Sequence, residues 1–377
     1  MSLHAKNRVV FLRSIIRSYY RLKPLEEPLY LHMREIALES LEDGKYIRHL
    51  SFPYMERLYE FLESGKTPLH LYYSSALYSD PSASSMDSKG WQGSELVFDI
   101  DADKYPGCST RLTICLGAGA AGGGGECPPG VESVEYKPVK WECIVRAWRD
   151  VTELYSILRG ELGFKSIEVY FSGNRGFHIR VLDEEILQLT RDQRRLIADY
   201  VACSNLDTRR VLPSFRGRVL FREREREHGL RRRVLEAALA RGLARKGTVA
   251  GLKGLVVEEE VVSKLIGEQC INIDKAVTVD TSRLSRFINS LNMKSGLRVA
   301  RLKPDSSIED LNFTFFSPFR GVVKVKPVVS IQGLQVLDES ISLKAGETIS
   351  LKAPLAVYLA IHGLVFPVEW SGIEVKL

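Results

Sequence analysis

Two aspartates one residue apart, Asp99 and Asp101, are the side chains in this sequence best suited to metal chemistry. They follow the apolar residues 96–98, which predict a buried strand. Because side chains alternate between the faces of a strand, both carboxylates are expected on one face. Carboxylates are hard ligands for Mg²⁺ or Mn²⁺, and two such ions stabilise the attacking and leaving oxygens of a phosphoryl displacement. An Asp-x-Asp that merely ends an exposed strand is the alternative, and the motif alone does not decide.

A second segment, residues 169–181, has two β-rich apolar runs on either side of Ser172-Gly-Asn-Arg-Gly176. Its glycines suit a tight turn, so the segment predicts a β-hairpin. Ser172, Arg175 and His178 are hydrogen-bond donors of the kind that hold phosphate oxygens. An ordinary polar hairpin would carry similar residues, so this segment needs the others beside it.

The third segment, residues 277–296, begins with an alternating pattern that predicts a strand ending at Asp280. Arg286 and Lys294 follow it. Three acids from two strands, with Arg and Lys nearby, suit nucleotidyl transfer from a triphosphate.

These segments, in this order, resemble the catalytic small subunit of archaeal and eukaryotic DNA primase, as do residues 34–52 and 91–101. The resemblance covers most of residues 1–202 and 271–330. It implies an α+β, primase-like catalytic core with a mixed or antiparallel sheet. We expect this core to be discontinuous, formed by residues 1–202 and 271–377.

The resemblance also implies roles for individual residues. Asp99, Asp101 and Asp280 would bind the catalytic Mg²⁺ or Mn²⁺. The nucleotide would be held by residues from all the matching segments: Ser172, Arg175, His178, Arg286, Asn292, Lys294, and from a less regular segment Glu35, Tyr46 and Arg48.

The activity implied is that of a nucleotidyltransferase, a DNA-dependent RNA polymerase that makes short primers on single-stranded DNA. The preference between ribo- and deoxyribonucleotides stays open. Family members pair with a large subunit that holds an iron–sulfur cluster. This sequence lacks four suitably placed cysteines for such a cluster, so it fits the catalytic half of a heterodimer.

The sequence departs from the family at two places. Asn292 stands where the archaeal pattern usually has histidine, and asparagine cannot become cationic, so we expect weaker nucleotide binding or a compensating cation. The family's zinc module is replaced by a glycine-rich loop expected over residues 108–130. Its Cys108, Cys115 and Cys127 would need a fourth ligand, such as Cys143 or a carboxylate, to retain zinc; disulfide bridges are the alternative.

Composition indicates an ordinary globular protein. Of 377 residues, 45% are hydrophobic, and no apolar run reaches membrane-spanning length. Residues 1–8 lack the apolar core of a signal peptide. We therefore expect a cytoplasmic protein with no membrane partner, and the resemblance implies that it works in the nucleoid-associated replication machinery.

Positive charge is concentrated between Arg209 and Lys246. This segment contains 13 Lys/Arg and 4 Asp/Glu, whereas the net charge of the whole chain is +6. Residues 203–270 separate the second and third segments and are expected to form a basic helical insertion. The basic run is either a solvated face or a contact with the template backbone, through residues such as Arg231–Arg233.

Two other functions remain open at this stage. A glycosyltransferase also uses Asp-x-Asp, to hold a nucleotide-sugar diphosphate through a metal, but it explains neither Asp280 nor the predicted hairpin. A non-catalytic nucleic-acid-binding subunit would not need three acids.

Overall fold

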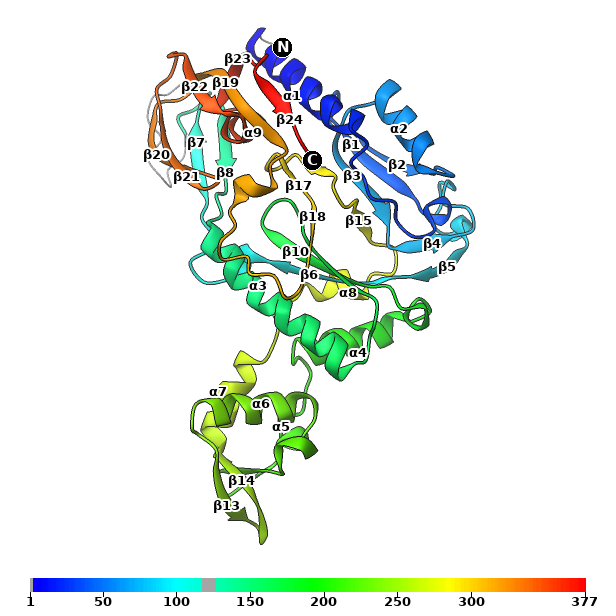
Figure 1. Cartoon of the computed structure of the whole chain (residues 1–377), viewed down its shortest axis with the longest axis vertical. Coiled ribbons are helices and arrows are strands. Elements are labelled where there is room, and N and C mark those ends of the chain that lie inside the picture. The colour runs from blue at the N-terminus through cyan, green and yellow to red at the C-terminus, as the bar shows by residue number, and fades with distance from the viewer. Residues whose placement is uncertain (1–2, 117–126) are drawn as a thin grey trace.

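The computed structural model describes residues 3–116 and 127–377 (Figure 1). The described part is α+β, and strand pairing is antiparallel in each of its sheets. A large body contains two four-stranded sheets and a C-terminal β-rich part, and the 203–270 insertion hangs from it beyond α3 and α4 (Figure 1). Within the described residues, no helix is long and apolar enough to cross a membrane.

The sheet that carries Asp99 and Asp101 has the strand order β18-β9-β10-β6. Its strands are β6 (Leu96–Asp101), β9 (Ile167–Phe171), β10 (Gly176–Val181) and β18 (Ala300–Leu302). One face packs on α3 (Trp141–Ser156), where the rings of Trp148 and Phe177 lie 5.2 Å apart. A π-helical turn (Ile157–Glu161) extends α3, and α4 (Arg191–Val201) follows β10. The predicted strand and hairpin are thus confirmed.

The second sheet has the order β15-β3-β1-β2 and faces the first (Figure 1). Its strands are β1 (Ile36–Ser40), β2 (Tyr46–Leu50), β3 (Pro68–Ser74) and β15 (Leu284–Arg286). It is covered by α1 (Leu3–Arg21) and α2 (Met55–Ser64), whose apolar faces join one hydrophobic core with the strands. β15 comes from the third sequence segment, so the sheet joins chain segments more than 200 residues apart.

A buried carboxylate ties these two sheets together. Glu95 is 2% exposed and is paired with Arg34, which precedes β1, and with Arg180 of β10. Arg180 also donates a hydrogen bond to the hydroxyl of Tyr73 in β3. Burial favours the neutral carboxyl, but the two guanidinium charges hold the pKa of Glu95 below its usual value. Removing either arginine would leave the buried carboxylate with one guanidinium partner in place of two.

The C-terminal part is rich in strands, as predicted. A four-stranded sheet contains β19 (Phe319–Pro327), β22 (Ile349–Lys352), β23 (Val365–Glu369) and β24 (Ile373–Val375). It packs against α9 (Ala353–Ile361), which is buried along its length. The remaining strand pairs are β20 (Ile331–Val336) with β21 (Glu339–Leu343), β16 (Leu291–Asn292) with β17 (Leu297–Arg298), β4 (Ala76–Tyr78) with β5 (Trp91–Ser94), and β7 (Leu112–Cys115) with β8 (Ser133–Tyr136). Short 3₁₀ turns occur at Leu31–Met33, Asp87–Lys89, Ala102–Lys104, Glu184–Ile186, Arg224–Arg226 and Phe313–Phe316.

The 203–270 insertion is not purely helical, in contrast to the prediction. It contains α5 (Thr208–Val211), α6 (Gly229–Ala240), α7 (Glu259–Glu268) and a sheet of order β11-β12-β14-β13. The strands are β11 (Ser214–Phe215), β12 (Arg218–Phe221), β13 (Arg245–Val249) and β14 (Leu252–Glu258). The helix predicted from the leucine spacing is observed as α6. Gly242, at a positive φ, follows its end, and the chain continues as β13. The insertion has its own hydrophobic cluster between helices and sheet.

Each of the arginines at 231–233 is already ion-paired with a glutamate of the same chain. This pairing argues against a template contact through them. Arg231 is ion-paired with Glu227 and donates to two backbone carbonyls. Arg232 pairs with Glu236. The neck of the insertion is where the chain enters and leaves it, near residues 203 and 270. Arg233 is 7% exposed and contacts the main body there, with its Nε 3.0 Å from Glu161.

All six cysteines of the sequence form disulfides: Cys108–Cys143, Cys115–Cys127 and Cys203–Cys270. The last joins the two chain crossings of the neck and closes the insertion as a loop. Of the predicted glycine-rich loop, residues 117–126 lie outside the described residues, and the flanking β7 and β8 form a hairpin.

Two adjacent arginines test how much the ion pair at the neck contributes to stability. Arg233→Ala should lower the free energy of unfolding by about 2 kcal/mol, because it removes a buried guanidinium that pairs with the partly buried Glu161 and donates to the carbonyl of Gln269. Arg232→Ala, which breaks an exposed pair, should lower it by less than about 1 kcal/mol. Guanidinium titration of both variants measures the difference, and equal losses would contradict the structural role of Arg233.

Candidate active site

The two aspartates lie on the sheet face that points away from α3. Asp99 is paired across the strands with His178, and Asp101 with Gly176, so all four residues share this face. A Cβ atom on Gly176 would lie only 2.8 Å from a carboxylate oxygen of Asp101. Glycine at this position therefore leaves the room that the carboxylate needs.

Both carboxyls are ionised only at a cost. Burial raises the pKa of Asp99 to about 6; the charges of Arg283 and Lys104 oppose this rise, and the charge of Asp274 adds to it. Burial likewise raises the pKa of Asp101 to about 6, and repulsion from Asp99 adds to it. The nearest cation, Lys104, has its Nζ 3.9 Å from Asp101, which is too far for a strong ion pair.

This donor set fits a divalent metal ion. Shielded carboxylates of raised pKa that lack a close cationic partner are stabilised by a bound Mg²⁺ or Mn²⁺. Across residues 3–116 and 127–377, no three His, Cys, Asp or Glu side chains converge as a preformed metal cage. Mg²⁺ commonly takes only one or two protein carboxylates and completes its shell with water and substrate phosphates, so the pair suffices.

His178 stands beside this pair as a neutral group. Its Nδ1 lies 3.9 Å from Asp99, and its ring stacks on Tyr170 with 5.5 Å between centroids. Burial lowers the pKa of His178 to about 4, and the charge of Arg286 lowers it further. At neutral pH the imidazole therefore offers a hydrogen bond without adding charge.

Three cations from different segments gather near the acids. Arg175 belongs to the turn between β9 and β10, Arg286 ends β15, and Lys294 follows β16. Burial lowers the pKa of Lys294, and repulsion from Arg286 and Arg175 lowers it further. Cations that repel one another in this way favour a polyanion between them. These are the cations that the sequence motifs grouped together.

The third segment differs from its prediction. Residues 275–279 form a helix, α8 (Lys275–Val279), and Asp280 follows it. One oxygen of Asp280 accepts hydrogen bonds from the backbone N and the Oγ of Ser282, each 2.8 Å long. At the other end of α8, the backbone N of Asp274 donates to the carbonyl of Asp99 at 3.0 Å. The acid adjoining Asp99 in this segment is therefore Asp274.

Arg286 is held by an aromatic wall that the sequence motifs did not reveal. Its Nη1 lies 2.9 Å from Nδ1 of His70, and its guanidinium lies 4.9 Å from the ring centre of Tyr72. The predicted Tyr46 packs edge-on against Tyr72, at 5.9 Å between centroids. Burial lowers the pKa of His70 far below its usual value, so its ring is neutral and can accept from Arg286.

Glu35 and Arg48 also come together, as the sequence grouped them. The Nε and Nη2 atoms of Arg48 lie 2.8 and 3.1 Å from the carboxylate of Glu35, which is fully buried. Burial would raise the pKa of Glu35, but hydrogen bonds from Arg48 and from the backbone of His49 hold it below the usual value. The fully buried Lys89, 3.5 Å away, was not predicted. Glu35 therefore orients a cation.

Asn292 supports the turn that carries Arg175. It is 2% exposed, its Nδ2 donates to the carbonyl of Ser172 at 2.9 Å, and its Oδ1 accepts from the backbone of Lys294 at 3.2 Å. Beside it, Ser295 donates to the carbonyl of Gly173, which has a φ of 74°. The amide predicted to contact the nucleotide thus has both ends engaged with the backbone.

The predicted residual zinc ligands are not free thiols. Cys108 is bonded to Cys143, and Cys115 to Cys127. Zinc binds cysteine as the thiolate, which a disulfide does not provide. The structure therefore supports the disulfide alternative for this region.

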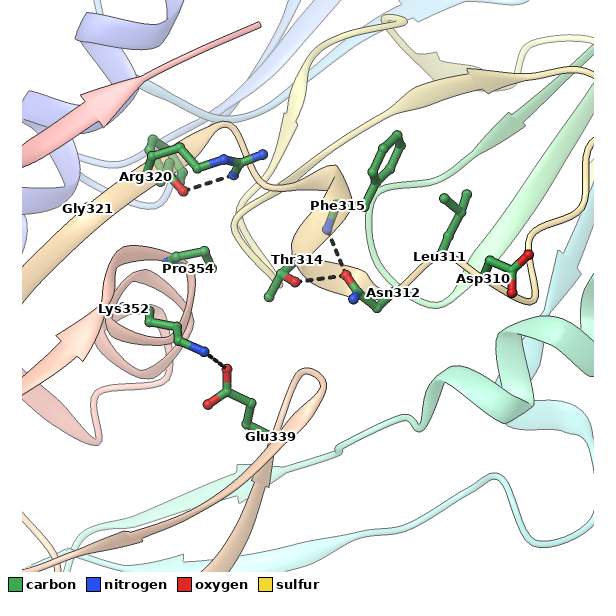
Figure 2. Close-up of a pocket in the computed structure, with 11 residues that line it drawn as sticks. Asp310, Leu311, Asn312, Thr314, Phe315, Arg320, Gly321, Glu339, Lys352 and Pro354 are labelled. Atoms are coloured by element: carbon green, nitrogen blue, oxygen red, sulfur yellow. Dashed lines mark hydrogen bonds and ion pairs between the residues drawn. The ribbon is translucent and has the colours of Figure 1, made fainter.

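A separate cavity of about 430 Å³ lies in the C-terminal part, between the Phe313–Phe316 turn, β19 and the start of α9 (Figure 2). Its Lys352 is paired with Glu339, and Arg320 donates to backbone carbonyls. None of the predicted site residues lines it.

Comparison with known proteins agrees with this geometry. A family model described as DNA primase small subunit matches residues 98–304. The DNA primase small subunit PriS of Staphylothermus marinus is 46% identical over 100% of both chains. That of Saccharolobus solfataricus is 34% identical over 94% of both, and that of Aeropyrum pernix 33% identical over 93% of this chain and 91% of its own. The chain belongs to the DNA primase small subunit family. The resemblance inferred from the motifs is confirmed, and it extends through the insertion and the C-terminal strands.

The raised pKa of Asp99 predicts that ionising this site residue destabilises the metal-free protein. The folded-state pKa of about 6 exceeds the unfolded value, so ionised Asp99 destabilises the metal-free fold above pH 6, and the penalty vanishes as pH falls toward 4. Asp99→Asn should therefore raise the metal-free free energy of unfolding at pH 8, on the order of 2 kcal/mol, and change it little at pH 4. Asp192→Asn, at an exposed helix position, is the control. Lower stability of Asp99→Asn at pH 8 would contradict the prediction.

Proposed function

We propose that this chain is the catalytic subunit of a DNA primase, which polymerises nucleotides into short primers on single-stranded DNA. The observation that carries the proposal is the pair of shielded carboxylates of raised pKa, Asp99 and Asp101, beside Arg175, Arg286 and Lys294. Such a site suits a metal-bound triphosphate. The relatives are named small subunits, so we also propose a large partner subunit, which family members use for initiation.

The chain's own residues account for binding and orientation. Asp99 and Asp101 would hold Mg²⁺ or Mn²⁺, which stabilises charge on the attacking and leaving oxygens. Arg175, Arg286 and Lys294 neutralise the triphosphate, with hydrogen bonds from Ser172 and His178 at the same edge. The primer 3′-hydroxyl attacks the α-phosphorus and pyrophosphate leaves, so no covalent enzyme intermediate is needed.

We propose a change in the third carboxylate. Asp274 adjoins Asp99 through its backbone and raises the pKa of Asp99 by its charge. Both acids accept hydrogen bonds within their own turns, Asp274 from Ala276 and Asp280 from Ser282, so the effect on Asp99 decides between them. Asp274 is therefore the better candidate to complete the metal site.

Primer synthesis tests the proposed activity. Purified chain is incubated with single-stranded DNA, labelled ribo- or deoxyribonucleotides and Mg²⁺ or Mn²⁺, with and without the large subunit. Wild type should make products, and Asp99→Asn/Asp101→Asn should lose about a hundredfold or more in rate, because charge stabilisation worth several kcal/mol disappears. Asp192→Asn serves as the control. Products that persist in the double variant, or none from wild type with its partner, would refute the proposal.

The third acid is tested by a matched pair of substitutions. Asp274→Asn should lower the rate of synthesis at least about tenfold, because it removes a carboxylate next to the metal pair. Asparagine still caps α8, so the helix is preserved. Asp280→Asn keeps the acceptor that Ser282 uses and should stay near wild type. A larger loss in Asp280→Asn would restore Asp280 as the metal ligand.

A further inference from the structure

The insertion presents one sheet face that its helices do not cover. Cross-strand neighbours share a face, and Val219, Phe221, Val257 and Leu255 lie on the face that joins the cluster under α6 and α7. The opposite, outer face is formed by the residues paired in alternate positions: Phe215, Arg218, Leu220, Arg245, Val249, Leu252, Val256 and Glu258. Glu258 is ion-paired with Arg245, so Arg218 is the cation of this face that has no carboxylate partner among the described residues.

The outer face is exposed toward its edges. Leu252 is 65% exposed and Phe215 is 46% exposed. In the middle of the face, Gly247 and Gly254 are paired across the strands, so neither position contributes a side chain there. The guanidinium of Arg216 lies 5.4 Å from the ring centre of Phe215. This arrangement leaves an aromatic ring available beside cations.

The insertion also holds the charge excess of the protein. It has 15 Lys/Arg and 9 Asp/Glu, which equals the net charge of +6 for the whole chain, so the remainder is balanced. Among the described residues, several of its cations have no carboxylate within 4.0 Å: Arg209, Arg216, Arg218, Lys246 and Lys253. Other arginines of the insertion are paired, for example Arg224 and Arg232 with Glu236. Of these cations, Arg218 lies on the outer face and Arg216 in the turn beside it, whereas Lys246 and Lys253 project from the opposite face.

We propose that this outer sheet face binds single-stranded DNA away from the active site. An exposed ring can stack on an unpaired base, and flanking cations can contact phosphates, as on the sheet surfaces that bind single strands elsewhere. A duplex hides its base faces and would use only the cations. The choice of DNA as the ligand rests on the proposed function.

The position of the face determines what binding would do. The aspartates lie on the sheet face opposite α3, whereas the insertion hangs beyond α3 and α4 (Figure 1). Its neck is fixed by the Cys203–Cys270 disulfide and by Arg233 with Glu161. The outer face therefore acts as a rigid second anchor for the template, and it takes no part in nucleotide transfer.

The test measures binding of fluorescent oligo-dT and of a duplex of equal length by the full-length chain, over a range of salt concentrations. Phe215→Ala should weaken single-strand binding at least about fivefold, the low end for one base stacked on an aromatic ring. Arg216→Gln/Arg218→Gln should also weaken it and reduce the salt slope by about 0.7 for each phosphate that is no longer neutralised. The matched control is Arg224→Gln/Arg232→Gln, which removes two paired charges on the helical side and should change binding much less.

Two outcomes would overturn the proposal. Single-strand affinity could be equal in Phe215→Ala, Arg216→Gln/Arg218→Gln and the control variant, which would show that the face is not used. Alternatively, duplex and single-strand affinity could fall by the same factor in Phe215→Ala, which would exclude base stacking. Both results are obtained without primer synthesis, so they are distinguishable from failure of the proposed activity.

Discussion

The antiparallel pairing of β6 with β10 is the constraint on which the active site depends. It sets Asp99 against His178 and Asp101 against Gly176, and the same alternation sends the residues between them into the core under α3. A shift of one residue would bury both carboxylates and expose phenylalanine and isoleucine. Hydrophobic packing on one face thus fixes the position of the acids on the other.

Burying carboxylates destabilises the fold, and this structure compensates for the buried charge at some carboxylates and not at others. Glu95 is buried but carries two arginine partners, so it stays ionised and joins the two sheets. Asp99 and Asp101 are shielded without such partners, and their raised pKa values reflect an interaction that the polypeptide does not supply. The contrast separates structural carboxylates, which are neutralised internally, from those suited to an external cation.

The sequence predicted elements whose signal is local, and it failed where the signal was not local. The hairpin around Ser172–Gly176 and the strand before Asp99 follow from apolar runs and glycines, and the structure confirms both. The alternation before Asp280 suggested a strand, but Asp274 caps a short helix there through Ala276, a side-chain contact that periodicity does not reveal. His70 and Lys89 became visible only through their contacts with distant Arg286 and Glu35. Likewise, no spacing distinguished disulfides from zinc among the cysteines.

The basic insertion shows why charge counted along a sequence does not locate a binding surface. The densest run of arginines, Arg231–Arg233, lies on a helix. Its guanidinium groups are ion-paired with glutamates, and Arg231 also donates to backbone carbonyls. Charge that is already paired gains little from a phosphate, because the new contact must first replace the old one. The cations left without a carboxylate partner, such as Arg216, Lys246 and Lys253, are sparser in the sequence, and most of them lie on the hairpins of the sheet. Within the insertion, pairing therefore decides more than abundance which cations are available to a polyanion.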